Sequence, residues 1–537
     1  MGIYLNSLDP FSFYSELCQS PYFIDKTPML EELIPRIGTT QKYICITRPR
    51  RFGKSAAANM IAAFFSAASN SGPLFDHLKI AETASYTEHL NMHPVIFAAF
   101  NRLPRHCVNY QQYIDRIEHR LLEDLKETYP NAAIGPEDAV WDALNVIHNT
   151  EHGIRFLFVF DEWDFIFHKD FITEKDKAAY LDFLSNLLKD QPYVELAYMT
   201  GILPIAKYSS GSELNMFTEY TMAEKIKYSS YFGFSEEEVD ELFHRYQKLT
   251  NNPRITRREL CRWYDGYRTP AGIRLYNPRS VICALSDNQL SNYWTNSGPY
   301  DEIFYYVKHN IDDIRDSLAL MAAGESVPAK VQEYAATSME LKTKDDIISA
   351  MVVYGFLSCE NNQVSIPNKE LMDQFADMMK REPSLGYVYR FAKESDRMLQ
   401  ATLAEDTAAM LEILEYAHNT EIPLLSYNNE TELTAVVNLV YLSARDTYRI
   451  EREDKAGIGY ADFMFYPENK KADCIILELK VGRTPEDAIQ QIIDRKYALR
   501  FTEYTGRILA VGISYDKKTK RHSCKIKVLK GAGICFQ

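Results

Sequence analysis

The stretch "TRPRRFGKS", Thr47 to Ser55, decides how the N-terminal half of the chain folds. The residues before it, "QKYICIT" (41–47), predict a buried strand, and the residues after it, "SAAANMIAAFFSAAS" (55–69), predict a helix. A loop that joins a strand to a helix offers an anion unpaired backbone N–H groups and the positive end of the helix dipole. We therefore expect a phosphate-binding loop here, and an ordinary basic surface turn is the alternative.

The loop contains the residue types that a bound nucleotide and its magnesium ion need. Gly53 allows close backbone approach, Lys54 reaches the β- and γ-phosphates, and the Ser55 hydroxyl ligates Mg²⁺. The general pattern has a glycine where Arg48 stands, and Pro49 fixes φ so that the turn can form without it. The residues assigned to ATP are Arg48, Pro49, Arg50, Arg51, Phe52, Gly53, Lys54 and Ser55.

A second stretch, "FLFVFDEWD" (156–164), ends an apolar strand on two acids. Carboxylates at the carboxyl end of a buried strand lie where open α/β sheets bind ligands, although a simple strand-ending turn has the same pattern. We expect Asp161 to hold Mg²⁺ and Glu162 to be the catalytic base that orients and deprotonates the attacking water. Asp164 is either a third ligand or a helix cap, and we favour the cap. Thr200, which ends another strand, either contacts the γ-phosphate or its water or is simply a strand-end threonine.

Short apolar strands and helices alternate in the first 235 residues. Strands are predicted at 93–100, 154–164 and 194–202, with helices at 111–129 and 177–190 between them. This alternation predicts an α/β fold in which helices cover a parallel sheet.

Length and charge indicate more than one domain. A chain of 537 residues exceeds what a single core usually supports, and we expect a P-loop domain at 1–235, a helical, winged-helix-like region at 236–410 and a small α/β domain at 411–537. The net charge is −14, but residues from 465 onward carry 15 Lys/Arg and 8 Asp/Glu, a local charge of +7. Such a basic segment can meet phosphate or can be a solvated face.

Cysteine usage and hydropathy suggest a cytoplasmic protein. The nine cysteines form no CxxC pair, which fits a reducing compartment. No apolar run approaches the length of a membrane span, so we expect no membrane association.

The C-terminal segment contains three residues suited to metal-dependent phosphodiester cleavage: Asp462 in "YADF", and Glu478 and Lys480 in "ILELK". The two carboxylates would hold Mg²⁺ against the scissile phosphate, and the lysine would stabilise or help activate the attacking water. Strand alternation puts Glu478 and Lys480 on one face, and Asp462 comes from a neighbouring strand. An exposed, salt-bridged strand would have the same pattern.

Other side chains are candidates for the same site. Gln491 and Lys496 are expected to face it from the following helix, with Tyr497 packed beside them. A further ligand could come from one of three glutamates, between which the sequence does not decide: Glu432, Glu451 and Glu453.

These motifs together resemble the family of predicted AAA-ATPase-like proteins with a C-terminal PD-(D/E)XK nuclease-superfamily domain, a bacterial family common in the gut. The resemblance covers residues of about 20–290 and is carried by "YFIDKTPML", "ITRPRRFGKS", "HPVIFAAF", "FVFDEWD", "MTGI", "YFGFSEEEV", "WYDGY" and "YNPRS". In this family an arginine also occupies the first-glycine position, so Arg48 is the expected residue. The resemblance implies a P-loop NTPase sheet of the ASCE type, related to STAND and archaeal-type ATPases.

The C-terminal domain resembles the family pattern G-x-G-x-x-D…ExK…Q-I-x-x-x-x-Y, at "GIGYADF", "LELKVG" and "QIIDRKY". This resemblance implies a restriction-endonuclease-like fold. The sequence departs from the family at three aromatic positions: Trp163 replaces a tyrosine, Phe160 an aliphatic residue, and Tyr460 an arginine. The acids and the lysine are intact.

The function expected from these features is that of a P-loop ATPase coupled to a Mg²⁺-dependent nuclease-like domain that acts on DNA or RNA. The alternative is a nucleotide-switched signalling or scaffold protein whose C-terminal domain binds without cutting. Arg48, Arg50 and Arg51 could contact phosphate, nucleic acid or a neighbouring subunit of a homo-oligomer, or could pair with surface acids.

Overall fold

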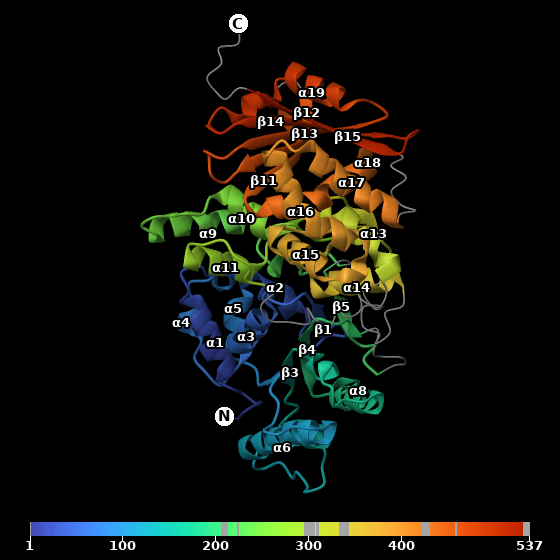
Figure 1. Cartoon of the computed structure of the whole chain (residues 1–537). Coiled ribbons are helices and arrows are strands. Elements are labelled where there is room, and N and C mark those ends of the chain that lie inside the picture. Colours follow the sequence, from blue (N-terminus) through green and yellow to red (C-terminus); the bar gives the residue numbers. More distant parts are fainter. Residues whose placement is uncertain are drawn as a thin grey trace. The chain divides into compact units, whose positions relative to one another are not determined.

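The computed structural model describes residues 2–205, 213–222, 225–294, 307, 311–331, 343–421, 430–456 and 459–529 (Figure 1). Side chains are described for these residues except at 311–313, 417–432 and 453–458. The chain divides into two compact units, Met1–Ile303 with Pro328–Glu370, and Phe304–Val327 with Leu371–Gln537. The expected middle region, 236–410, is thus shared between the two units.

The first unit is built on a parallel five-stranded sheet with the order β2-β3-β4-β1-β5. Its strands are β1 (Tyr43–Thr47), β2 (Val95–Ala99), β3 (Phe156–Asp161), β4 (Val194–Gly201) and β5 (Thr218–Tyr220). Strand β4 lies between β1, which leads into the loop, and β3, which ends on the acids. This is the expected ASCE-type order, and it brings the carboxyl ends of all five strands to one edge.

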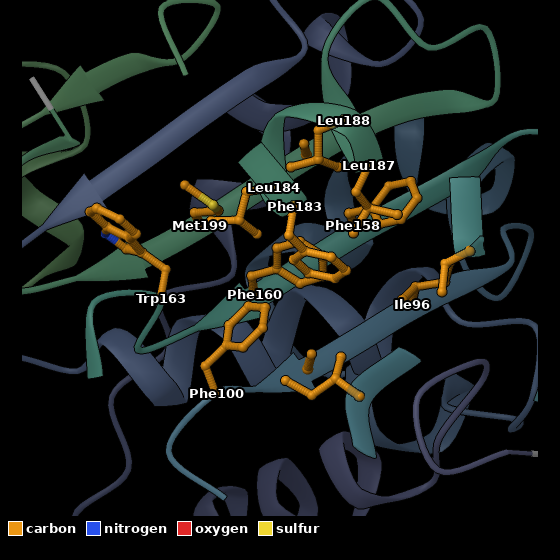
Figure 2. Packing of buried hydrophobic residues seen from close by; sticks show 14 of the residues in the cluster. Ile96, Phe100, Phe158, Phe160, Trp163, Phe183, Leu184, Leu187, Leu188 and Met199 are labelled. Carbon is orange, nitrogen blue, oxygen red and sulfur yellow. The ribbon is translucent and has the colours of Figure 1, made fainter. Parts of the chain in front are cut away.

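Both faces of this sheet are buried because neighbouring residues of each strand point to opposite layers. Leu157 and Val159 of β3 pack in the layer of α1 (Asp9–Cys18) and α3 (Lys54–Phe65). Phe158 and Phe160 pack against Phe183, Leu184, Leu187 and Leu188 of α8 (Glu174–Leu188), as Figure 2 shows. The helices α6 (Tyr110–Thr128) and α7 (Val140–Thr150) share this second layer. Burial on both faces explains why the strands are continuous apolar runs.

The remaining elements of the first unit are short helices and hairpins. Ser235 caps α9 by accepting a hydrogen bond from the Glu238 N–H. Tyr264 and Tyr267 of "WYDGY" are buried in the core. The elements are α2 (Pro28–Leu33), α4 (Gly72–Phe75), α5 (Ser85–His89), α9 (Glu236–Leu249), α10 (Arg257–Tyr264), β6 (Tyr267–Arg268), β7 (Arg274–Leu275), α11 (Pro278–Asp287), α14 (Lys344–Tyr354), β9 (Ser358–Glu360) and β10 (Gln363–Ser365).

The second unit contains a mixed sheet with the order β11-β12-β13-β14-β15 (Figure 1). Only β13 and β14 pair in parallel, and the helix α19 (Pro485–Asp494) connects them. The strands are β11 (Tyr448–Ala456), β12 (Gly459–Pro467), β13 (Cys474–Val481), β14 (Ile508–Asp516) and β15 (Arg521–Leu529). The helices are α13 (Ile311–Ala322), α16 (Tyr387–Leu403), α17 (Thr407–Glu421) and α18 (Glu430–Val440); α15 (Lys369–Arg381) and β8 (Val327–Pro328) span the division between the units.

The expectation that one helix carries both Gln491 and Lys496 is wrong. Helix α19 ends at Asp494, Lys496 has a φ of 55°, and a 3-10 helix covers Tyr497–Phe501. A left-handed residue cannot continue an α-helix, so the chain turns at Lys496.

None of the helices within the described ranges has the length and apolar character needed to cross a membrane.

Candidate functional site

The loop from Thr47 to Ser55 joins β1 to the N-terminus of α3, as expected. Gly53 is the N-cap residue with a φ of 92°, and no side chain caps the helix. Arg51 also has a positive φ, 69°. Left-handed residues at such a turn direct backbone N–H groups into a concave anion site, and the helix dipole favours negative charge there. The loop backbone is therefore shaped for a phosphate group.

The ammonium group of Lys54 is buried inside this loop. Its Nζ donates hydrogen bonds to the carbonyl oxygens of Arg48 and Pro49, both at 2.9 Å. Burial lowers the pKa of Lys54 to about 8, and the carboxylates of Asp164, Asp161 and Glu162 oppose this shift. Neutral carbonyls hold the ammonium in place of an ionic partner, so phosphate oxygens would be stronger acceptors for it.

Thr200, at the end of β4, holds the acids at the end of β3. Its hydroxyl donates to Asp161 Oδ1 at 2.5 Å, and its oxygen accepts a weaker hydrogen bond from the Glu162 N–H at 3.4 Å. Thr200 is fully buried. The described contacts make it a positioning residue, while the predicted contact with a γ-phosphate stays a prediction.

The backbone of Glu162 adopts a left-handed conformation with a φ of 54°. Such a conformation costs a non-glycine residue free energy and is common at active sites. Burial and the neighbouring Asp161 raise the pKa of Glu162, while a hydrogen bond with the Asn101 side chain lowers it. The structure thus presents Glu162 as a partly desolvated carboxylate that Asn101, just beyond β2, orients.

Asp164 has a different role from the helix cap that we favoured. Its Oδ2 accepts hydrogen bonds from the N–H groups of Ile202 and Leu203, at 2.9 and 2.7 Å. It makes no capping hydrogen bond to the 3-10 helix Phe165–His168 that follows it. Asp164 therefore fixes the segment after β4.

Lys54, Glu162 and Asp164 line a cavity of about 980 Å³, whereas the buried Asp161 and Thr200 are not among its lining residues. Four cationic side chains line it: Arg50, Arg51, Lys54 and Arg279. The carboxylates Glu162 and Asp164, the Ser55 hydroxyl and the Asn101 amide line it as well. Cations on the loop beside carboxylates on the neighbouring strand ends suit a polyphosphate with a divalent metal ion.

Arg279 and Asn101 are lining residues that the sequence analysis missed. Arg279 follows Pro278 at the start of α11, and Asn277 caps this helix by accepting from the Ser280 N–H. An asparagine cap followed by proline is a recognisable helix start, but nothing in the sequence relates that start to the distant loop.

The side chain of Arg48 points away from the cavity. It is 1% exposed, and its Nη1 donates to the carbonyl oxygens of Thr47 and Tyr220, both at 2.7 Å. Its guanidinium carbon lies 5.2 Å from the centre of the Phe232 ring. The arginine at the first-glycine position thus connects β1 to the edge strand β5.

Two other loop residues also pack into the first unit. The buried Phe52 ring makes an edge contact with Tyr267 at 4.8 Å between centroids. A Cβ atom on Gly355 would lie 2.6 Å from Pro49 Cβ, so only glycine leaves room for that proline. The side chains of Pro49 and Phe52 therefore hold the loop. The Phe52 backbone N–H remains a candidate for phosphate contact, whereas proline has no N–H to donate and the Pro49 carbonyl accepts from Lys54.

Glu370 is a buried carboxylate that holds the outer side of the loop. It accepts hydrogen bonds from the Ser280 hydroxyl at 2.9 Å and from the N–H groups of Tyr293 and Trp294 at 2.6 and 2.8 Å. The Trp294 indole donates to the carbonyl of Arg50 at 3.3 Å. Burial raises the pKa of Glu370 to about 7. Sequence reasoning missed this contact because its partners are distant along the chain.

The second candidate site lies in the sheet of the second unit, where β12 and β13 separate. Asp462 Oδ2 accepts from the Leu479 N–H at 2.7 Å, and the Asp462 N–H donates to Glu478 Oε1 at 3.3 Å. Lys480 Nζ lies 3.4 Å from Glu478 Oε2. The three predicted residues are therefore together. The pair of Lys480 and Glu478 is an ion pair, but the strand that carries it is largely buried, so the alternative of an exposed strand is wrong.

Gln491 also belongs to this site, as expected. Its amide donates to Glu478 Oε2 at 2.9 Å, and Tyr497 is hydrogen-bonded to the same glutamine. Lys496 is exposed at the turn after α19. The Glu451 side chain is paired with Arg449 at 3.3 Å, and the side chains of Glu432 and Glu453 lie outside the described residues.

The electrostatics of the second site suit a divalent cation. Burial and the adjacent Asp462 raise the pKa of Glu478 to about 8. A cation between the two carboxylates would stabilise their charged forms and so oppose the effect of burial. Carboxylate oxygens are also ligands that Mg²⁺ prefers. Across the described residues no group of three or more His, Cys, Asp or Glu side chains forms a complete ligand set, so water and substrate would supply the other ligands.

Two family models match the chain. Residues 12–210 match the family described as "Predicted AAA-ATPase", and residues 428–524 match the "PD-(D/E)XK nuclease superfamily". The chain carries an AAA-ATPase-like domain and a PD-(D/E)XK nuclease-superfamily domain. This is the architecture expected from the sequence, and the ATPase-like domain supports nucleotide binding.

One curated relative is the "Uncharacterized protein in vnfD 5'region" of Azotobacter chroococcum mcd 1. It is 26% identical over 282 residues, which are 52% of this chain and 51% of the relative. The matched part thus spans about half the length of that protein.

Two solved structures show weak overall similarity. The Walker-type ATPase PABY2304 of Pyrococcus abyssi is 11% identical with a TM-score of 0.35, covering 65% of this chain and 94% of the other. The ORC2 protein of Aeropyrum pernix, solved as ADPNP–ADP complexes, is 12% identical with a TM-score of 0.33, covering 68% and 93%. The strand order, and not these global scores, defines the fold.

Replacing Arg48 with the glycine of the general loop pattern should damage the first unit. Arg48→Gly removes two buried charge-assisted hydrogen bonds, so we expect the free energy of unfolding to fall by about 3 kcal/mol. The matched control Arg50→Gly removes a cavity-lining side chain from the same loop and should cost about 1 kcal/mol or less. Urea denaturation measures both. An Arg48→Gly protein as stable as the wild type would contradict the structural role.

Proposed function

We propose that the chain binds ATP with Mg²⁺ at the loop Thr47–Ser55 and hydrolyses it, and that the C-terminal domain cleaves phosphodiester bonds in nucleic acid. One observation carries the first part: Lys54, Ser55 and Glu162 line a single cavity. The cluster of Asp462, Glu478 and Lys480 supports the second part.

In the ATPase half, each residue has a task that follows from its contacts. The loop backbone and Lys54 bind the phosphates, with Arg50 and Arg279 offering further positive charge from the cavity wall. Glu162, whose pKa is raised, accepts the proton of the attacking water, and Asn101 orients its carboxylate. Ser55 and Asp161 are the oxygen ligands for Mg²⁺, which would neutralise phosphate charge when bound.

In the nuclease-like half, the carboxylate of the buried Glu478 is held by hydrogen bonds to both of its oxygens. Gln491 and Lys480 hold one of its oxygens, and the Asp462 N–H holds the other. Asp462 and Glu478 are the ligands for a divalent cation that would polarise the scissile phosphate. Lys480 orients the attacking water and stabilises the developing negative charge.

Substitutions at Lys54 and Glu162 should separate ATP binding from hydrolysis. Lys54→Ala should weaken binding of a fluorescent ATP analogue, because the cavity loses its buried ammonium. Glu162→Gln should bind with near wild-type affinity but release phosphate about 10²- to 10⁴-fold more slowly, because it lacks the base. Lys79→Ala, an exposed lysine of the same unit, is the control. If both variants hydrolysed ATP at the wild-type rate, the proposed mechanism would be wrong.

The affinity for ATP should depend on pH through Lys54. Below pH 8 the free protein already carries the ammonium form, so its charge is unchanged on binding. Above pH 8 the free amine is neutral and must take up a proton, so the affinity should fall about 20-fold between pH 7.5 and pH 9.5. Titrations at both pH values measure this, and a wild-type affinity that stays constant would contradict it. The weak binding of Lys54→Ala should be insensitive to pH.

Cleavage of nucleic acid tests the second half of the proposal. Wild-type protein should cut labelled DNA or RNA in Mg²⁺ and not in EDTA, and Lys480→Ala and Asp462→Asn should reduce the rate at least about 100-fold. Lys518→Ala, in the exposed turn after β14, should not change the rate. If the Lys480→Ala protein still cleaves nucleic acid at the wild-type rate, the proposed nuclease mechanism is wrong. If the wild type binds nucleic acid without cleaving it, the scaffold alternative is favoured.

A further inference from the structure

Tyr460 is an exposed aromatic residue beside the second candidate site. It is 62% exposed, whereas the residues after Asp462 on the same strand are buried through Pro467. Tyr460 lies two residues before Asp462, so both side chains project from the same face of β12. The ring therefore stands at the rim of the acidic cluster and on the face that carries it.

Backbone contacts fix the strand segment that carries this ring. The Tyr497 hydroxyl donates to the carbonyl oxygen of Tyr460 at 2.6 Å, and Tyr497 itself is buried. On the other side, Tyr460 pairs with Lys455 in the ladder of β11 and β12. Because the backbone is already fixed, packing a flat partner on the ring costs only the freedom of the side chain.

Positive charge lies near the strand segment that carries the ring. A Cβ atom on Gly459 would be 2.9 Å from Arg495 Nη1, so this guanidinium lies against the backbone next to Tyr460. Lys480 provides a second cation in the acidic cluster. Aromatic rings interleaved with cations are what proteins use to bind single-stranded nucleic acid, in which bases stack and phosphates pair with the cations.

We propose that Tyr460 is a stacking platform for an unpaired base next to the scissile phosphate, so that this domain prefers single-stranded over duplex nucleic acid. This inference rests on the proposed nuclease-like function of the same site. In a duplex the bases are already paired and stacked, and a base must be flipped out at a cost before it can reach the ring. The preference for unpaired strands follows from that cost.

The test measures the affinity of the full chain for labelled 20-nucleotide DNA and RNA single strands and for the corresponding duplexes. Fluorescence anisotropy in EDTA prevents cleavage during the titration. The wild type should bind single strands more tightly than duplexes. Tyr460→Ala should lose about fivefold to 100-fold in single-strand affinity with little change for duplexes, and Tyr460→Trp and Tyr460→Phe should retain it.

Tyr416→Ala is the matched control. Tyr416 is 56% exposed on α17, whose sheet contact is with β15, so its removal should leave both affinities unchanged. Circular dichroism and light scattering verify that each variant is folded and has the wild-type oligomeric state.

Three results would overturn the proposal. A Tyr460→Ala protein with an unchanged ratio of single-strand to duplex affinity would show that the ring does not read unpaired bases. A variant that changes only the oligomeric state would assign the ring to a protein contact. A wild type that binds and cleaves no nucleic acid would reject the proposed function itself, and this inference with it.

Discussion

The buried ammonium of Lys54 is the constraint on which the nucleotide site depends. It is held by two loop carbonyls and lies near three carboxylates, Asp161 at the end of β3 and Glu162 and Asp164 directly after it. A buried charge in this position requires a rigid loop around it. Residues whose side chains lie outside the cavity make the loop rigid. Arg48 ties the loop to β5, and the Glu370 network ties its outer side to Tyr293 and Trp294. The loop is thus assembled by side chains that do not face the cavity.

The two sites use the same physical device in different sheets. Each places carboxylates beside a lysine where strands end or separate, and each leaves one carboxylate with a raised pKa, Glu162 in the first unit and Glu478 in the second. Burial makes these charges costly, so each site gains most from a ligand of complementary charge. A polyphosphate suits the cationic cavity, and a divalent cation suits the pair of acids. Both ligands are those that the sequence predicts.

The sequence predicts the sheet, the loop and the acids because each is a local pattern: an apolar strand, a Gly-Lys-Ser turn, and acids that directly follow a buried strand. It does not predict β5, which has only three residues, or the left-handed turn at Lys496. It also misses Arg279 and Glu370, whose roles depend on contacts between residues far apart in the chain. The Thr200 and Arg48 side chains illustrate the same limit, since their orientations follow from packing with partners that no local pattern identifies.

The most direct measurement of the central claim is a crystal structure with a non-hydrolysable ATP analogue and Mg²⁺. The account predicts that Lys54 Nζ exchanges the carbonyl oxygens of Arg48 and Pro49 for oxygens of the β- and γ-phosphates, with Asp161 and Ser55 on the metal side. A structure in which Lys54 keeps both carbonyl contacts while the nucleotide binds elsewhere would contradict it.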